Sequence, residues 1–428
     1  MSASNPRPLI ALRWQVVLLV SLATALSYLD RQTLPIAIKA IERDIPIDAQ
    51  QFANLNTAFL LTYAIMYAVG GRIIDVLGTR LGFLIVMVFW SLACAGHGLA
   101  TSFAMLAFFR LCLGAGEGGG FPAATRVMAE WVPAKDRTFA MGIINTGSAF
   151  GMIVAPFLIS RILDHASWPW VFFVAGGLGL IWSVWWFFRY HPPETNARLT
   201  EGERGELEIL ANSYGHPAVP QPWLELLRLR PTWGLLVAKF LSDGAWYFYL
   251  FWLPKYLYDA RHLNIKEVAT FVWMPAVAMA IGSFFGGWFS SWLLHRNYSL
   301  NAARKIALAM SALLMPCVLV VTTVPLSWAI VIFCLAYLGH QFWATILMTL
   351  PADIFSKNSV GSVAGLMGCA GGLGGVVFGE AMGWLLQHGF GWPLVFTLGG
   401  AMHVLSFALL CAFMPRLQPL TPRPVTTT

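Results

Sequence analysis

Apolar stretches of about twenty residues recur along the chain between short polar breaks, which is the length a membrane-spanning helix needs. Strands of an outer-membrane barrel would instead show a weaker alternation over about ten residues. The pattern therefore predicts an all-α integral membrane protein. We expect twelve transmembrane helices, at residues 14–36, 52–72, 81–101, 104–127, 138–160, 169–189, 232–257, 268–294, 304–323, 327–350, 361–386 and 392–414.

One long polar segment, residues 191–231, divides these spans into six and six. It contains LTEGERGELEIL, which is typical of a short amphipathic helix on a membrane surface, and then a proline-rich stretch. We therefore expect an N-terminal six-helix bundle at 1–190, a cytoplasmic linker at 191–231, and a C-terminal six-helix bundle with a short cytoplasmic tail at 232–428.

The two halves share an internal repeat. WPWVFFVAGG, from Trp168, returns as WPLVFTLGGA from Trp392, and GIINTGSAFG, from Gly142, resembles GLMGCAGGLG from Gly365 at nearly the same offset. Parallel repeats of six spans are typical of secondary transporters, which bind their substrate near the midplane between the halves.

Composition agrees with this reading. Hydrophobic residues make up 58% of the chain and charged residues 11%, whereas soluble domains carry about a quarter charged residues. Most of the 27 Lys and Arg fall between spans on the side of the chain termini, so the positive-inside rule places both termini in the cytoplasm. The net charge of +7 therefore reflects topology, and we expect no nucleic-acid partner.

Neither a cofactor nor enzymatic chemistry is indicated. The six cysteines lie in apolar runs without metal-ligand spacing, and the chain contains no HExxH or GxSxG motif. We expect no metal, no cofactor and no enzyme activity.

Four charged residues inside the first and fourth spans carry the candidate chemistry: Asp30, Arg31, Arg110 and Glu117. Arg110 and Glu117 are seven residues apart, so a helix brings both to one face. A charge at bilayer depth costs at least a few kcal/mol, so these side chains must face protein or water. Their charges sum to zero. They form either a functional site or two buried salt bridges that only fix helix packing.

These residue types suit the uptake of an anion with a proton. A guanidinium replaces the water around a carboxylate better than an ammonium does, because its planar fork makes two parallel hydrogen bonds. Glu117 lies among glycines, which supply no side chain, so we expect it to lack a fixed partner. We hypothesise that its protonation releases a nearby arginine, Arg110 or Arg31, for the substrate.

Further polar residues within the spans are candidates for hydroxyl recognition, although packing explains any one of them as well. Lys239 and Asp243 are four apart on the seventh span, and we expect them to pair as a structural or gating element. The candidate substrate contacts beside the arginines are Tyr28, Tyr63, Tyr67, Asn145, Ser148, Trp246, Tyr247, His340 and Gln341.

GRIIDVLGTR, between the second and third spans, resembles the loop motif of the major facilitator superfamily. That resemblance makes Gly71, Asp75, Gly78 and Arg80 gating or structural residues. Longer stretches resemble its anion:cation symporter family, and most of all the bacterial hexuronate transporters. They are SYLDRQTL, FRLCLGAGEGGGFPAA, AEWVPAKDRTFAMGIINTGSAFG, KFLSDGAWYFYLFWLPKYL and GHQFWATILMTLPADIF.

The resemblance implies proton-coupled uptake of a hexuronate (galacturonate or glucuronate) across the bacterial inner membrane, by a monomer within the lipid bilayer. It assigns proton coupling to Asp30 and Glu117 and anion binding to Arg31 and Arg110. Ser148 and Gly372 stand where the aldonate branch has amides, which favours hexuronate. Another organic anion (an aldonate, an aromatic acid or a dicarboxylate) and a membrane sensor of sugar acids remain the alternatives.

Overall fold

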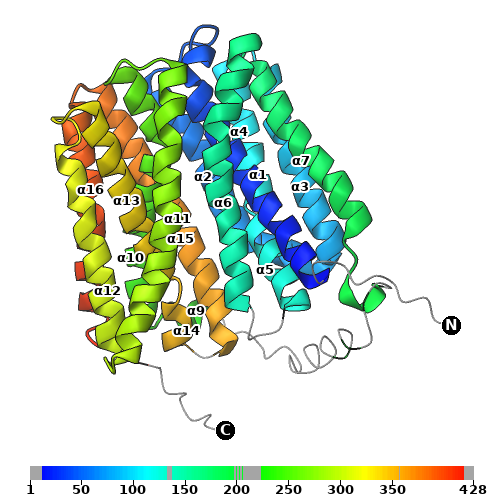
Figure 1. The fold of residues 1–428 in the computed structure, drawn as a ribbon, viewed down its shortest axis with the longest axis vertical. Coiled ribbons are helices and arrows are strands. Elements are labelled where there is room, and N and C mark those ends of the chain that lie inside the picture. Colours follow the sequence, from blue (N-terminus) through cyan, green and yellow to red (C-terminus); the bar gives the residue numbers. More distant parts are fainter. Residues whose placement is uncertain are drawn as a thin grey trace.

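Long helices running side by side form the protein in its computed structural model, which describes residues 12–132, 137–196, 199, 202, 205, 223–355 and 357–418 (Figure 1). The first half of the chain forms α1 (Leu12–Ile41), α2 (Ala49–Leu77), α3 (Thr79–Gly96), α4 (Phe103–Glu117), α5 (Gly120–Trp131), α6 (Arg137–His165) and α7 (Pro169–Arg189). The second half forms α9 (Trp223–Leu226), α10 (Arg230–Asp259), α11 (Ile265–His295), α12 (Leu300–Leu314), α13 (Leu326–Leu347), α14 (Leu350–Ile354), α15 (Lys357–Gln387) and α16 (Gly391–Phe413).

Each expected span coincides with one helix or with two consecutive helical segments. In the described part of the chain, nine helices are long and apolar enough to cross a membrane. The count of twelve spans, the cytoplasmic position of the termini and the division into two bundles therefore stay predictions. The amphipathic helix expected after residue 199 falls mostly outside the described residues.

Several expected spans are not continuous α-helices. The third ends in a 3-10 helix, His97–Leu99, and the tenth is interrupted after Leu347. The fourth stops at Glu117 and resumes at Gly120, because Gly118 and Gly119 form a tight turn whose amides bond to Gly114 and Gly116. In the ninth, α12 ends at Leu314 and a 3-10 helix, Met315–Val320, follows. Pro316 has no amide hydrogen to continue the α-helical ladder.

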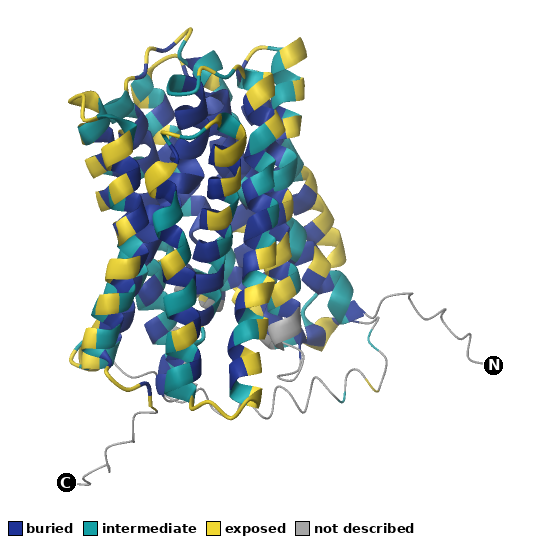
Figure 2. Ribbon diagram, turned by 60° about the vertical axis from the view of Figure 1, so that its left-hand side comes forward, coloured by how far each residue is buried: buried dark blue, intermediate teal, exposed yellow. Residues whose placement is uncertain are grey.

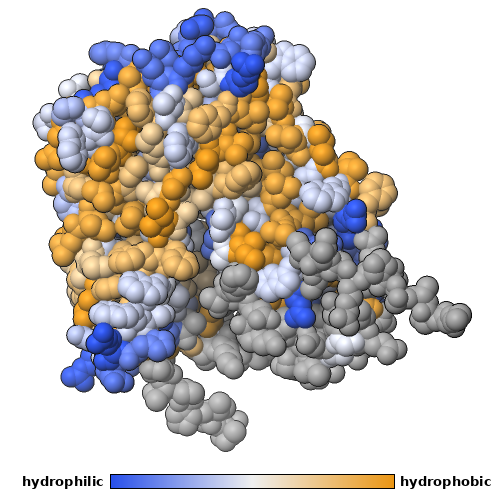
Figure 3. Space-filling view, viewed as in Figure 1, coloured by the Kyte–Doolittle hydropathy of each residue, from blue (hydrophilic) through white to orange (hydrophobic). Residues whose placement is uncertain are grey.

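The surface has the hydrophobic belt of a membrane protein. On the face shown in Figure 3, apolar residues cover the middle, and hydrophilic residues gather at the top and at the lower left. Large apolar side chains are exposed to the surroundings, among them Ile181, Phe284 and Leu313. Buried residues lie mainly toward the interior of the helix assembly, and exposed ones mainly on its outside (Figure 2). Side chains with no polar partner on an outer face are suited to lipid rather than water.

The internal repeat gives the two halves equivalent helix contacts. A Cβ on Gly151 of α6 would overlap the carbonyl of Ala25 on α1, and a Cβ on Gly374 of α15 would overlap that of Phe240 on α10. Small residues let membrane helices approach closely, since van der Waals packing rather than the hydrophobic effect holds them together. The repeated glycines therefore explain why α1 packs on α6 and α10 on α15.

The end of the molecule at which α1 passes into α2 is at the top of Figure 1. In the predicted orientation this end faces outward, and we call it the outer end.

A matched pair of substitutions on α6 tests this packing. We expect Gly151→Ala to lower the unfolding free energy by about 1–3 kcal/mol, the usual cost of overpacking. Gly142→Ala should leave it unchanged or raise it, because nothing lies within 4 Å of a Cβ there. Thermal unfolding in detergent checks both, and equal midpoints for the two variants would contradict the proposed close contact.

Candidate functional site

An ion pair between α1 and α4 forms the centre of the site. Arg31 Nε donates a hydrogen bond to Glu117 Oε2 at 2.7 Å, and the hydroxyl of Ser27, one turn earlier on α1, donates to the same oxygen at 2.7 Å. All three residues are buried. A charge-assisted bond in such surroundings is strong, so Glu117 fixes the position of Arg31.

The guanidinium of Arg31 is surrounded by aromatic rings. Its central carbon lies 4.7 Å from the ring centres of Tyr28 and Tyr63 and 5.5 Å from that of Phe59. Since only Nε bonds to Glu117, the two terminal nitrogens have no hydrogen-bond partner among the described residues. These are the nitrogens that would form a two-bond fork with a carboxylate.

Asp30 and Arg110 lie beside this pair, within electrostatic reach of Glu117 and of each other. Asp30 Oδ1 accepts a weak hydrogen bond from the thiol of Cys94 at 3.5 Å, and its Oδ2 has no partner. Arg110 is completely buried, and none of its side-chain nitrogens has a hydrogen-bond partner in the described structure. The structure thus brings the four intramembrane charges together but pairs only two of them directly.

The expectation that Glu117 lacks a fixed partner is wrong. A Cβ on Gly114 would overlap the carbonyl of Phe59, and one on Gly116 would overlap Trp90, so these glycines bring α4 close to α2 and α3. Helix α1 then supplies Ser27 and Arg31 as partners from 90 and 86 residues away in sequence. Local composition gave no signal of these long-range contacts.

Tyrosines extend the site from Arg31 toward α10. The ring of Tyr63 packs at a tilt against that of Tyr67, and the ring of Tyr67 stacks on that of Phe121. Tyr247 on α10 lies within electrostatic reach of both Arg31 and Asp243. Tyr28, Tyr63, Tyr67 and Tyr247 therefore connect the two halves of the chain, and the structure shows no hydrogen bond from their hydroxyls to another described residue.

Lys239 and Asp243 form the expected pair on α10, with 2.8 Å between Nζ and Oδ2. Asp243 packs so closely on α15 that a Cβ on Gly371 would overlap its carboxylate. On α13, the ring of His340 stacks on that of Trp246 with 4.5 Å between the ring centres and 4° between the planes.

Three other candidates have no described contact with the arginine cluster. The Ser148 hydroxyl bonds back to the carbonyl of Asn145 on the same helix, and Asn145 itself is exposed. Gln341 is half-buried, and only its main-chain carbonyl is engaged, by Thr345.

The loop motif is described only in part. Gly78 has φ = 75°, a conformation that favours glycine, and it joins α2 to α3. Arg80 donates to the carbonyl of Phe187 on α7 at 2.7 Å and lies over the ring of Phe187. The side chain of Asp75 lies outside the described part, and Gly71 is described only as a residue of α2.

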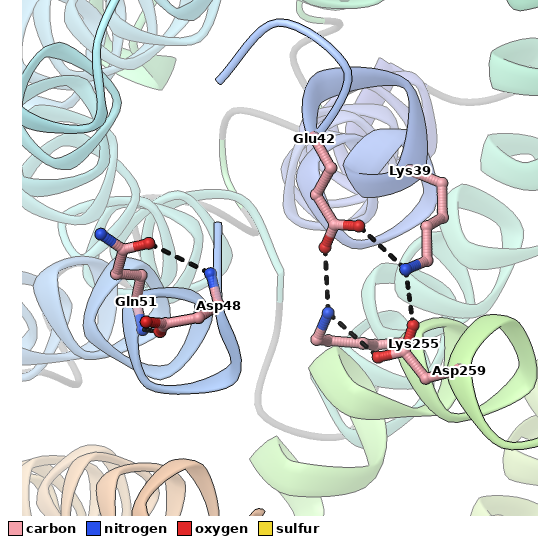
Figure 4. A network of polar contacts seen from close by, with 6 residues as sticks. All are labelled: Lys39, Glu42, Asp48, Gln51, Lys255 and Asp259. Carbon is pink, nitrogen blue, oxygen red and sulfur yellow. Dashed lines mark hydrogen bonds and ion pairs between the residues drawn. The ribbon is translucent and has the colours of Figure 1, made fainter. Parts of the chain in front are cut away.

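A closed ring of four charges joins α1 to α10 at the outer end, and the sequence analysis did not identify it (Figure 4). Between the helices, Lys39 pairs with Asp259 at 2.6 Å and Lys255 with Glu42 at 3.0 Å. At each helix end, Lys39 pairs with Glu42, the residue that follows α1, at 2.9 Å, and Lys255 pairs with Asp259 at 3.1 Å. The sequence shows a lysine and an acid three or four residues apart at each of these helix ends, which predicts a pair at each end. It does not show that the two ends lie next to each other.

Other polar contacts between the halves lie near this outer end. The Tyr258 hydroxyl donates to the Ile36 carbonyl at 2.6 Å, and Gln50 donates to Glu380 at 2.6 Å. Lys266 at the start of α11 pairs with Asp164 near the end of α6 at 3.2 Å.

Known proteins similar to this chain are membrane transporters. The hexuronate transporter of Escherichia coli strain K12 is 33% identical over 92% of this chain and 94% of that protein. The galacturonate transporter of Dickeya chrysanthemi is also 33% identical, over 71% of this chain and 89% of that protein. Among solved structures, the inward open conformation of the E. coli xylose transporter XylE matches with a TM-score of 0.73 at 14% identity, covering 94% of this chain and 97% of that one.

The helical architecture agrees with that structural match, and the family model of the major facilitator superfamily matches residues 20–379. With most of its length covered, this chain belongs to the major facilitator superfamily.

Proposed function

We propose that this protein is a symporter of the bacterial inner membrane that imports a hexuronate, galacturonate or glucuronate, together with a proton, by alternating access. The observation that carries the proposal is the buried pair of Arg31 and Glu117 (2.7 Å). In it a carboxylate holds a guanidinium that lies among aromatic rings and whose two terminal nitrogens have no hydrogen-bond partner among the described residues. This substrate class agrees with the similarity to a hexuronate transporter and a galacturonate transporter.

The mechanism follows from competition for Arg31. A proton on Glu117 neutralises the carboxylate that binds Arg31 Nε and so weakens their bond. The guanidinium then turns its fork to the substrate carboxylate, while Tyr28 and Tyr63 keep it over their rings. Loss of the proton restores the pair and displaces the substrate.

Energetics favour carrying a proton with the anion. Moving a monoanion into a cell against an inside-negative potential costs about 2.3 kcal/mol per 100 mV. One proton cancels this cost, and a second makes the potential a driving force. Asp30 is the candidate for the second proton, or else the fixed counter-charge of the otherwise unpaired Arg110.

Recognition of a sugar rather than a simple acid rests on the tyrosines. The hydroxyls of Tyr28, Tyr63, Tyr67 and Tyr247 both donate and accept hydrogen bonds, as sugar hydroxyls do. Such a surface also fits an aldonate or an aldaric acid, so another organic anion is the alternative substrate. A membrane sensor that binds the same ligand without moving it is the alternative outside transport.

In this mechanism the charge ring at the outer end closes the pathway when the substrate site faces inward. Its pairs Lys39–Asp259 and Lys255–Glu42 join the two halves, which must separate at this end for substrate to enter from outside. Lys239–Asp243 and the loop residues Gly71, Asp75, Gly78 and Arg80 are the proposed structural elements of the opposite movement.

Uptake into proteoliposomes tests the proposed function directly. With pH gradient and potential set independently, we expect accumulation of labelled galacturonate or glucuronate that an inward proton gradient drives. Aldonates, aldaric acids and aromatic acids serve as competitors. If no hexuronate entered or competed, the substrate would be wrong; if hexuronate bound without entering, the protein would be a sensor.

Substitution of Glu117 separates coupling from binding. Glu117→Gln cannot carry the proton, so we expect it to lose accumulation by about tenfold per pH unit of gradient, since one pH unit is worth about 1.4 kcal/mol per proton. Exchange of labelled for unlabelled substrate should continue. Glu225→Gln, the same change at an exposed glutamate of α9, is the control. Full accumulation by Glu117→Gln would exclude the coupling role.

Charge inversion tests the outer ring. The double variant Lys39→Glu/Lys255→Glu brings four acids together, and we expect it to shift the population about fivefold or more toward an open outer end, because each lost pair is worth up to about 1 kcal/mol. The quadruple variant that also carries Glu42→Lys/Asp259→Lys restores the alternation and should restore closure. Distances between spin labels at the exposed positions Arg43 and His262 measure the opening. Equal distances in both variants would contradict the gate.

A further inference from the structure

His403 on α16, a buried histidine to which the sequence analysis gave no role, bonds to His340 on α13. His340 Nδ1 lies 3.0 Å from His403 Nε2, and the two ring planes are 88° apart. Of these two nitrogens, one must carry a hydrogen and the other a lone pair. That choice fixes what His340 offers at its other nitrogen, Nε2.

The surroundings of His403 decide between the two arrangements. Three other histidines, His97, His295 and His388, lie at or just after the C-terminal end of a helix and place Nδ1 2.8–2.9 Å from the carbonyl four residues earlier. His403 makes no such contact, and its Nδ1 is fully enclosed without a partner. A hydrogen on this Nδ1 would be a buried donor with no acceptor, which is rare and costly.

The proton of His403 therefore belongs on Nε2, which donates it to Nδ1 of His340. His340 in turn carries its own proton on Nε2. That atom has no hydrogen-bond partner among the described residues and is not one of the fully enclosed atoms. The imidazole N–H thus remains free to bond to a ligand.

The groups around His340 offer hydrogens in the same region. Its ring lies flat on Trp246, whose indole N–H also has no partner in the described structure and is not fully enclosed. Lys239, within electrostatic reach of His340, has an ammonium group that can only donate. Helices α10 and α13 thus carry these donors, in the half of the chain that does not contain Arg31.

We propose that His340 donates its Nε2 hydrogen to an oxygen on the part of the substrate distant from its carboxylate, and that His403 is the positioning residue that fixes His340 as this donor. Stacking on the indole of Trp246 holds the His340 ring parallel to the indole plane. The inference rests on the proposed function, because the oxygen belongs to the sugar acid bound at Arg31. The proposed bond to His340 adds a substrate contact in the second half of the chain. This contact favours sugar acids that carry an oxygen atom at the position that His340 Nε2 can reach.

Nitrogen NMR of the full-length protein labelled in its histidines tests the arrangement without any substrate. We expect His340 to carry its hydrogen on Nε2 with a bare Nδ1, and His403 to carry its hydrogen on Nε2. Comparison with His340→Gln assigns the signals. A hydrogen on Nδ1 of His340 would overturn the proposal, whatever the protein transports.

Two substitutions of nearly equal shape test the effect on transport. His403→Met fills the space without a donor, and we expect the KM for hexuronate to rise about 3- to 10-fold, the value of one neutral hydrogen bond, with little change in kcat. His403→Gln places an amide N–H near the position of Nε2 and should restore a low KM. Ser406→Ala is the control, because it removes a buried hydrogen bond from the same face of α16, to the carbonyl of Ala238, without touching His340.

The outcomes separate this inference from the proposed function. An unchanged KM in His403→Met, or an equal rise of KM in His403→Met and His403→Gln, would overturn the positioning role. Uptake of hexuronate by the wild type would still support the proposed function. An equal rise in Ser406→Ala would show that α16 packing alone sets KM. If the wild type transported no hexuronate, the proposed function would fail, and the NMR result would still decide which nitrogen His340 presents.

Discussion

The ion pair between Arg31 and Glu117 is the contact on which the rest of the site depends. Each charge alone would be costly inside a membrane, and the pair is tolerable because the two groups touch and Ser27 adds a second donor. The glycines of α4 bring it against its neighbours, and the tyrosines cover the guanidinium. A buried pair of this kind contributes little to stability. In the proposed mechanism its role is to let a proton or an anion replace one of the two partners.

Much of the fold and the types of residue in the site could be predicted from the sequence, because both depend on local signals. The length of the apolar runs predicted where the helices lie, and charged residues such as Asp30 and Glu117 were identifiable because they occur singly within those runs. Where local rules failed, glycine or proline was responsible. Gly118–Gly119 interrupts the fourth span, and Pro316 turns the end of the ninth into a 3-10 helix.

Contacts between distant helices could not be predicted. Sequence reasoning left Arg110 and Arg31 as equal candidates for Glu117, and the choice depends on how α1 and α4 are rotated against each other. The same holds for His403, which is isolated in an apolar run until α16 packs beside α13. The repeat does not remove this difficulty, since Arg80 bonds to a carbonyl of α7 while Arg304, its counterpart in position, pairs with Asp353 at 2.9 Å.

In the proposed mechanism, the charge ring at the outer end lowers the cost of movement. Lys39 lies on α1 and Glu42 directly follows that helix, while Lys255 and Asp259 lie on α10, so each helix end holds one cation and one anion that already touch. When the helices part, the two contacts between them break, but each helix leaves as a neutral unit whose members still have each other. No bare charge is exposed at the mouth of the pathway, and the ring can close again without having to strip water from an unpaired ion.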